Sequence, residues 1–207
     1  MRGTVLGDKV WRIDQESPDL PLLQRELGCS RLLAHLLARR GLVDPTVARR
    51  FLDPSYDHLA DPLLLPDAVP AIQRMVQALD RHERIYVHGD YDGDGITAAA
   101  LWTRLLQRLG GDVLVHVPHR RDDGYDMRSH FVETARQAGA RLIVTADCGI
   151  QRNREVEEAR RAGLDVIITD HHEVGRELPN AVAVVNPHRR DSRYPFRDLA
   201  AVGVAYR

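Results

Sequence analysis

The apolar and polar positions follow two different patterns along the chain. From Trp11 to about residue 84, apolar residues recur at the spacing of amphipathic helices. The helices that we expect there cover residues 30–40, 44–52 and 67–81. The polar residues of this part do not converge on an evident chemistry. We therefore assign residues 1–83 to a helical N-terminal region.

After residue 84 the pattern changes to short apolar runs that alternate with helical segments. The expected strands are residues 85–87, 113–117, 142–145, 166–169 and 182–185. The expected helices between them are residues 97–109, 127–138 and 152–162. Such alternation predicts right-handed βαβ units and an α/β fold, in which a parallel β-sheet has helices on both faces. We assign residues 84–207 to this one domain.

Polar and ionisable residues come directly after the expected strands. The strands are followed, in chain order, by His88 to Asp92, Pro118 to Arg120, Asp147 to Gly149, Asp170 to His172, and Asn186 to His188. In an open parallel sheet, ligands bind at the carboxyl ends of the strands, where the strand order reverses. These residues are therefore predicted to converge from separate loops onto one crevice.

The most acidic of these stretches is the one after the first expected strand. His88, Asp90, Asp92 and Asp94 lie within seven positions, with no lysine or arginine among them. Carboxylates so close together repel one another unless a cation neutralises them, which predicts a metal site. An EF-hand is excluded, because its twelfth position needs a glutamate and this chain has Leu101. The donors suit a hard divalent ion such as Mn²⁺ or Mg²⁺.

Several of these residues also have simpler interpretations. Taken alone, His88 is a hydrogen-bonded histidine at a strand end, and Asp147 caps the helix that follows it. The basic patch around Arg120 and Tyr125 holds a phosphate, stacks a base, or is a solvated loop. Taken together, the histidines and carboxylates exceed the needs of one ion. Two metals about 3.5 to 4 Å apart would favour hydrolysis of a phosphoester.

Composition restricts the setting in which this chemistry occurs. The formal charge is −1, so nucleic-acid binding requires a local basic patch. Two distant cysteines, Cys29 and Cys148, indicate neither a disulfide framework nor a zinc site. The chain begins without a signal peptide, and no apolar stretch approaches the roughly 20 residues of a membrane span. We expect a cytoplasmic protein without membrane contact.

At this point three short motifs resemble those of a known family. HGDYDGDGIT at 88–97, TADCG at 145–149 and TDHH at 169–172 are similar to motifs I, II and III of the DHH phosphoesterase superfamily. Within it, the resemblance is to the RecJ family, the 5′ to 3′ exonucleases specific for single-stranded DNA. Further similarity to that family lies at residues 40–54, 118–125 and 185–207. The resemblance thus covers nearly the whole chain.

The resemblance implies a two-metal centre with Mn²⁺ or Mg²⁺. By it, one metal is held by His88, Asp92 and Asp147, and the other by Asp94, the bridging Asp147 and His171. It further implies that His172 contacts the scissile phosphate and that Asp170 supports the histidines. Asp90 is either a ligand in one metal state or a base beside the metal. Arg120 is expected to bind the 5′ phosphate of the DNA, and Tyr125 to line the path of the strand.

The implied function is hydrolysis of single-stranded DNA in repair and recombination. The implied substrate carries a 5′ phosphate, a helicase and a single-strand-binding protein are candidate partners, and the protein is expected to be a monomer. Two alternatives remain: a hydrolase of small phosphoesters such as pyrophosphate, cyclic dinucleotides or short oligoribonucleotides, and a non-catalytic replication scaffold. RecJ-like proteins carry a fourth aspartate motif and further domains after a segment like VGVAY, so we expect this chain to be an incomplete fragment, weak or inactive alone.

Overall fold

The computed structural model describes residues 2–6, 9–13, 17–124 and 126–207. The chain divides into two compact units, Met1–Leu59 and Ala60–Arg207. The predicted functional residues all belong to the second unit.

The first unit contains two paired strands, three short α-helices and one 3₁₀ helix. The strands β1 (Arg2–Leu6) and β2 (Lys9–Ile13) pair antiparallel, and the helices are α1 (Leu20–Leu27), α2 (Arg31–Arg39), α3 (Pro45–Leu52) and the 3₁₀ turn η1 (Tyr56–His58). The expected helical character from Trp11 onward is wrong for β2, because its backbone pairs with β1.

The helices expected at residues 30–40 and 44–52 are confirmed. Asp44 caps α3 by accepting the backbone N–H of Thr46 at 2.7 Å, and Ser30 caps α2 by accepting that of Leu33 at 3.2 Å. A small apolar core joins α1, α2 and α3, formed by Leu20, Leu23, Ala34, Leu37 and Ala48.

The second unit is the predicted parallel sheet with helices on both faces. Its helices are η2 (Pro62–Leu64), α4 (Ala68–Asp80), α5 (Gly93–Arg108), α6 (Ser129–Gln137), α7 (Asn153–Arg161) and α8 (Ala201–Tyr206). Its strands are β3 (Arg84–Gly89), β4 (Val113–His116), β5 (Ala140–Ala146), β6 (Asp165–Thr169) and β7 (Ala183–Val185). They lie in the order β4-β3-β5-β6-β7, and every neighbouring pair is parallel.

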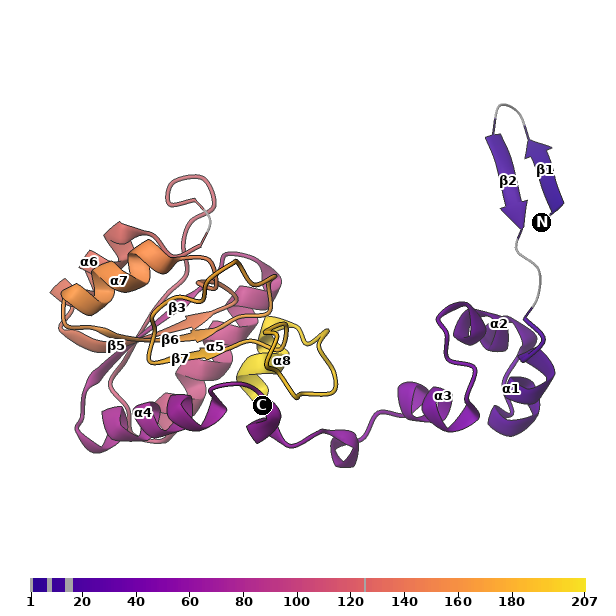
Figure 1. The fold of residues 1–207 in the computed structure, drawn as a ribbon, viewed down its shortest axis with the longest axis horizontal. Helices are drawn as coiled ribbons and strands as arrows, with labels where there is room; N and C mark the ends of the chain where they lie inside the picture. Colours follow the sequence, from indigo (N-terminus) through magenta and orange to yellow (C-terminus); the bar gives the residue numbers. More distant parts are fainter. Residues whose placement is uncertain (1, 7–8, 14–16, 125) are drawn as a thin grey trace. The chain divides into compact units, whose positions relative to one another are not determined.

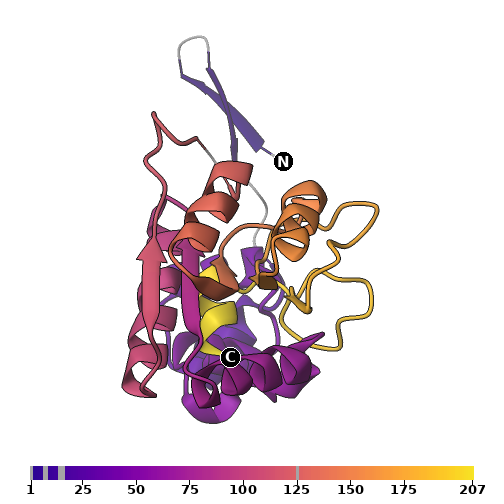
Figure 2. The same cartoon turned by 90° about the vertical axis from the view of Figure 1, so that its left-hand side faces the viewer.

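Alternate residues of each strand supply two separate cores. Ile85 and Val87 of β3 belong to the core under α4, α5 and α8, whereas Tyr86 belongs to the core under α6 and α7. Figures 1 and 2 show these two groups of helices on opposite faces of the sheet. The central strands β3, β5 and β6 are apolar on both faces, as expected of a buried parallel sheet.

The spatial unit begins before the predicted domain boundary at residue 84. Helix α4 contributes Ala71, Met75 and Ala78 to the core under β3. Its Arg74 is buried and forms ion pairs of 2.6 Å with Glu83 and Asp165. Because α4 packs on the sheet in this way, it shares the unit of the strands, whereas the boundary at residue 84 stays a prediction.

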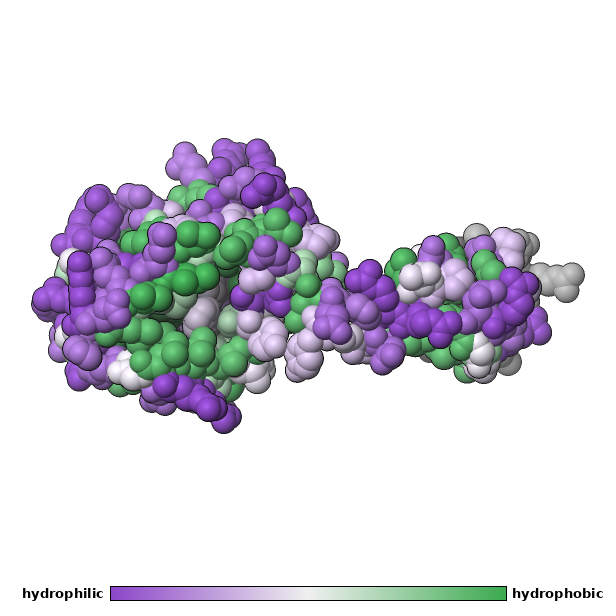
Figure 3. Space-filling model, turned by 90° about the horizontal axis from the view of Figure 1, so that it is seen from below, coloured by the Kyte–Doolittle hydropathy of each residue, from purple (hydrophilic) through white to green (hydrophobic). Residues whose placement is uncertain are grey.

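An apolar groove marks the outer side of the core formed with α4. Residues of α4, α5 and α8 line a cavity of about 240 Å³, and Figure 3 shows apolar side chains gathered around a hollow on this side. Within the described ranges, no helix combines the length and the apolar character that crossing a bilayer requires.

Candidate metal centre

The strand order places the predicted crevice between β3 and β5. The chain passes from β3 outward to β4 and then returns across β3 to β5, so the strand order reverses between these two neighbours. Asp90 follows β3, and its backbone N–H donates to the carbonyl of Ala146 at 3.1 Å. The backbone N–H of Asp147 in turn donates to the carbonyl of Thr169 at 3.0 Å. Neighbouring strands thereby hold three acid-bearing loops side by side.

The acidic turn after β3 has a tightly constrained backbone. Asp92 caps α5, because one carboxylate oxygen accepts the backbone N–H groups of Asp94 and Gly95, both at 2.9 Å. These two hydrogen bonds lower the pKa of Asp92 and keep it ionised. A side chain at Gly95 would place its Cβ 2.6 Å from the backbone of Asp90. Glycine at position 95 therefore lets the helix start directly against the end of β3.

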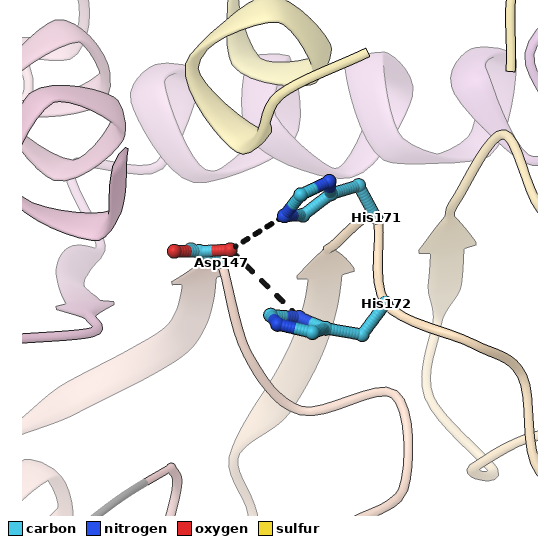
Figure 4. Close-up of side chains that lie close together, drawn as sticks. All are labelled: Asp147, His171 and His172. Carbon is cyan, nitrogen blue, oxygen red and sulfur yellow. Dashed lines mark ion pairs between the residues drawn. The ribbon is translucent and has the colours of Figure 1, made fainter. Parts of the chain in front are cut away.

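Asp147 lies at the centre of the side-chain cluster. Its backbone is left-handed, with φ of +72°. Its Oδ1 lies 3.2 Å from His171 Nε2 and 3.8 Å from His172 Nδ1, and Figure 4 shows both imidazoles directed at this carboxyl group. Ligand atoms of Asp147, His171 and His172 lie within 4.8 Å of one another, as do those of Asp90, Asp92 and Asp147. Asp147 is the member common to both groups.

The electrostatics of this cluster favour a cation. Burial, followed by the nearby charges of Asp94 and Asp92, raises the pKa of Asp147 to about 8. Burial also raises the pKa of Asp90. Oδ1 of Asp90 and Oδ1 of Asp147 are buried, and neither has a hydrogen-bond partner of normal geometry among the described residues. Buried carboxyl oxygens without a well-aligned donor fit a divalent ion, which would neutralise them and keep them deprotonated.

Asp170 fixes the orientation of the His172 ring. Its Oδ1 lies 2.8 Å from His172 Nδ1 and accepts the backbone N–H groups of His171 and His172. Its Oδ2 accepts the backbone N–H of Ile150 at 3.0 Å. Burial opposes the charge of Asp170, but these hydrogen bonds outweigh burial and lower its pKa. The bond to Asp170 raises the pKa of His172 to about 9. This is the supporting contact expected of Asp170.

Asp94 lies in the cluster and also accepts hydrogen bonds from the start of α8, a helix that is distant in the sequence. Its Oδ2 lies 3.5 Å from His171 Nε2. Both its carboxylate oxygens accept backbone N–H groups at the start of α8, from Ala201 at 2.7 Å and from Val202 at 2.9 Å. Asp94 therefore links the acidic turn to the last helix of the chain.

The structure does not bring His88 to this cluster. Its imidazole is fully buried and stacks on His116, with ring centroids 5.5 Å apart; the ring of Phe131 lies tilted against it, with centroids 4.7 Å apart. Burial lowers the pKa of His88 to about 3, and its surroundings contain His116 and His130 rather than the carboxyl groups of the cluster. Strand β3 continues to Gly89, so position 88 still faces α6 as Tyr86 does. Asp90 lies beside Asp92 and Asp147 instead. The assignment of His88 as a ligand thus stays a prediction that this geometry does not support.

The predicted DNA-contacting residues lie partly outside this cluster. Arg120 is exposed, and its guanidinium lies over the ring of Tyr91, 5.2 Å from the centroid. Tyr91 separates Asp90 from Asp92, so Arg120 is placed next to the acidic turn. Tyr125 lies outside the described residues. The tyrosine that Arg120 contacts was not among the predicted site residues.

Three further side chains, those of Thr145, Thr169 and Trp102, support the cluster through hydrogen bonds that no local feature of the sequence predicts. Thr145 donates from Oγ1 to the carbonyl of Cys148 at 2.7 Å, across the turn that carries Asp147. Thr169 donates from Oγ1 to the carbonyl of Thr145 at 2.5 Å, and Trp102 Nε1 donates to the Thr169 hydroxyl at 3.2 Å. These hydrogen bonds join α5, β5 and β6 beneath the cluster.

Comparisons with known proteins identify the family of this chain. The family model described as "DHH family, N-terminal domain" matches residues 84–207. The exonuclease RecJ of Bacillus subtilis, specific for single-stranded DNA, is 37% identical over 198 residues, which are 95% of this chain and 25% of the relative. The RecJ exonuclease of Escherichia coli is 43% identical over 137 residues, 66% of this chain and 24% of the relative. The chain therefore spans about a quarter of the length of these relatives.

Solved structures extend the similarity to three dimensions. RecJ of Thermus thermophilus in complex with Mn²⁺ has a TM-score of 0.71 at 31% identity, over 95% of this chain and 27% of that chain. Another exonuclease RecJ, bound to manganese, has a TM-score of 0.62 at 36% identity, over 71% of this chain and 37% of that chain. The predicted parallel sheet with helices on both faces is confirmed by these neighbours and by the strand order.

Proposed function

The chain belongs to the DHH family, and from that membership we propose that its protein is a metal-dependent 5′ to 3′ exonuclease of single-stranded DNA that acts in repair and recombination. The similarity to RecJ exonucleases that are specific for single-stranded DNA supports the substrate. The observation that carries the chemistry is the pair of buried carboxyl oxygens, Asp90 Oδ1 and Asp147 Oδ1, in one cluster with His171. This donor set suits Mn²⁺ or Mg²⁺, the ions in the solved RecJ complexes.

We assign the ligands of two ions to the cluster as follows. Asp92 and Asp147 would hold one ion, with Asp90 in the place that the family resemblance assigned to His88. Asp94, Asp147 and His171 hold the other. Asp147 would contribute to both ion sites, because it is a member of the group with Asp90 and Asp92 and of the group with His171 and His172. When bound, the ions supply an activated water and neutralise charge on the phosphate.

The remaining residues orient the substrate. The Asp170 carboxylate fixes the ring of His172, whose side chain is 43% exposed and lies at the edge of the cluster. His172 is thereby placed to donate a hydrogen bond to a non-bridging oxygen of the scissile phosphate. Arg120 binds the 5′ phosphate from beside Tyr91. Tyr125 lines the strand's path in this proposal.

The test uses the product of the complete reading frame that encodes this chain. With Mn²⁺ and a 5′-phosphorylated single strand, Asp147→Ala is expected to lower kcat/KM by more than the 10–100-fold that supporting residues of metal sites contribute. Asp112→Asn is the matched control, because Asp112 pairs with Arg84 at the other end of the sheet. Full activity of Asp147→Ala would overturn the proposal. Hydrolysis of dinucleotides but not of long strands would favour the small-phosphoester alternative instead.

A further inference from the structure

A second polar cavity lies beside His172. Its volume is about 220 Å³, and it is lined by Asp126, Ile150, Gln151, Arg152, Asp170 and His172. A single water needs only about 10–15 Å³ of such space. The cavity is therefore large enough for a group of several heavy atoms. None of its residues except Asp170 and His172 takes part in the chemistry described above.

The two carboxylates that line this cavity, Asp126 and Asp170, already interact with other groups of the protein. The Asp126 side chain is 8% exposed; its Oδ1 accepts the backbone N–H groups of Met127 at 2.7 Å and Gly149 at 2.9 Å. Its Oδ2 lies 2.7 Å from Arg152 Nε. Asp170 is 1% exposed and is satisfied by backbone N–H groups and by His172. Neither carboxylate presents much of its charge to a ligand.

In the ion pair between Asp126 and Arg152, the arginine is the partner that is more exposed to the cavity. Arg152 is 31% exposed and remains charged at every physiological pH. Its ion pair with Asp126 holds the Nε edge of the guanidinium, so the side chain is oriented before a ligand arrives. The N–H groups of a guanidinium match the oxygens of a phosphate. This cavity thus favours a phosphate over a cation or a neutral group.

We propose that Arg152 forms an anion subsite for the phosphodiester group that neighbours the scissile phosphate. The proposal rests on the proposed function, in which His172 contacts the scissile phosphate and shares this cavity with Arg152. In that arrangement Arg152 fixes the register of the strand, because it engages the next unit of the backbone. Arg152 is a binding residue for the substrate and takes no part in the chemical step.

The first test measures anion binding without any catalysis. In the 207-residue chain with Mg²⁺ present, inorganic phosphate is titrated while NMR follows the Arg152 Nε–H signal. Phosphate is expected to shift this signal, and Arg152→Gln is expected to weaken phosphate binding roughly tenfold. Arg152→Lys keeps the positive charge but not the guanidinium, so its phosphate affinity should fall between those of Arg152→Gln and the unaltered chain. Arg160→Gln is the matched control, since Arg160 pairs with Glu157 on the same helix. Equal phosphate affinity in Arg152→Gln and the unaltered chain would overturn the subsite.

The second test asks which phosphate of the strand is bound. The product of the complete reading frame is given single strands that carry one neutral methylphosphonate linkage on either side of the first scissile bond. On the natural strand, Arg152→Gln should lower kcat/KM roughly tenfold. On one of the two modified strands, Arg152→Gln should not lower kcat/KM any further, because the neutral linkage has already removed the contact with Arg152. Losses that multiply on both modified strands would overturn the proposal. Absence of any nuclease activity would defeat the proposed function instead, and the phosphate titration would still decide the subsite.

Discussion

The Asp94 carboxylate accepts a 2.7 Å hydrogen bond from the backbone N–H of Ala201, a residue 107 positions further along the chain. The same carboxylate lies 3.5 Å from His171 in the proposed metal centre. One side chain thus serves both the cluster and the start of α8. Removing it is expected to affect metal binding and helix stability together.

Asp94→Ala should therefore weaken Mn²⁺ binding and loosen α8. Loss of the cap is expected to cost about 1 kcal/mol. Calorimetry measures the Mn²⁺ affinity, and hydrogen exchange at the Ala201 and Val202 amides measures the helix. Asp44→Ala is the matched control, because Asp44 caps α3 in the first unit. It should lower stability by a similar amount without changing Mn²⁺ binding. Unchanged exchange at Ala201 in Asp94→Ala would contradict the role of the cap.

Substitutions at His88 and Asp90 test which of these two residues is a metal ligand beside Asp92 and Asp147. His88→Phe keeps an aromatic ring against His116 and Phe131, so Mn²⁺ affinity and stoichiometry should not change. Asp90→Ala should weaken Mn²⁺ binding about tenfold or more, because it removes a ligand atom of the Asp90, Asp92 and Asp147 group. Isothermal calorimetry with Mn²⁺ measures both. Loss of a bound ion in His88→Phe would instead support His88 as a ligand.

Tyr86 should make the protein sensitive to alkali. Burial raises the pKa of Tyr86 to about 12, above the unfolded value of about 10. Above pH 10 the unfolded chain therefore loses this proton first, and stability falls as the pH rises toward 12. Between pH 9 and pH 11 the loss is about 1 kcal/mol.

Tyr86→Phe should remove this part of the alkaline loss. Its buried hydroxyl has no hydrogen-bond partner among the described residues, so the substitution is expected to be neutral or stabilising at pH 7. Urea unfolding of both proteins at pH 7, 9 and 11 measures the free energy of unfolding. Parallel decreases in both proteins from pH 9 to pH 11 would contradict the expectation.

Thr145→Val should disturb the turn that carries Asp147. The substitution removes the hydroxyl that donates to the carbonyl of Cys148, and we expect a loss of about 1–3 kcal/mol in stability with weaker Mn²⁺ binding. Thr103→Val is the control, since the Thr103 hydroxyl donates to Ala99 within α5. The control should lose less stability and keep its Mn²⁺ affinity. Equal Mn²⁺ affinity in Thr145→Val would show that the turn does not depend on this bond.

Much of the sheet is predictable because its signals are local. Apolar runs locate β5 and β6, and Asp44-Pro45 locates the start of α3 at the residue expected. The hairpin at residues 2–13 was missed, because its pairing is a contact between two strands rather than a feature of either one.

The loops that form the site could be predicted from the sequence, but the contacts of some of its side chains could not. His88 stays a predicted ligand that the geometry does not support, because β3 extends past Val87 and the alternation of a strand turns position 88 toward α6. The cap that Asp94 provides to α8 depends on a contact between residues 107 positions apart. The pair of Asp126 and Arg152 joins two residues from separate loops that only the fold brings within 2.7 Å of each other. Such contacts come from the assembled fold.

The strand order has an evolutionary consequence. Asp90 and Asp147 follow β3 and β5, two strands that pair directly with each other. The chain between them runs through α5, β4 and α6, none of which lies between these two strands. Insertions or deletions at residues 117–124 would leave the pairing of β3 with β5 unchanged. The loop that carries Arg120 can therefore diverge in length and sequence while the acidic cluster keeps its spacing. In this arrangement substrate preference and metal chemistry are free to evolve separately.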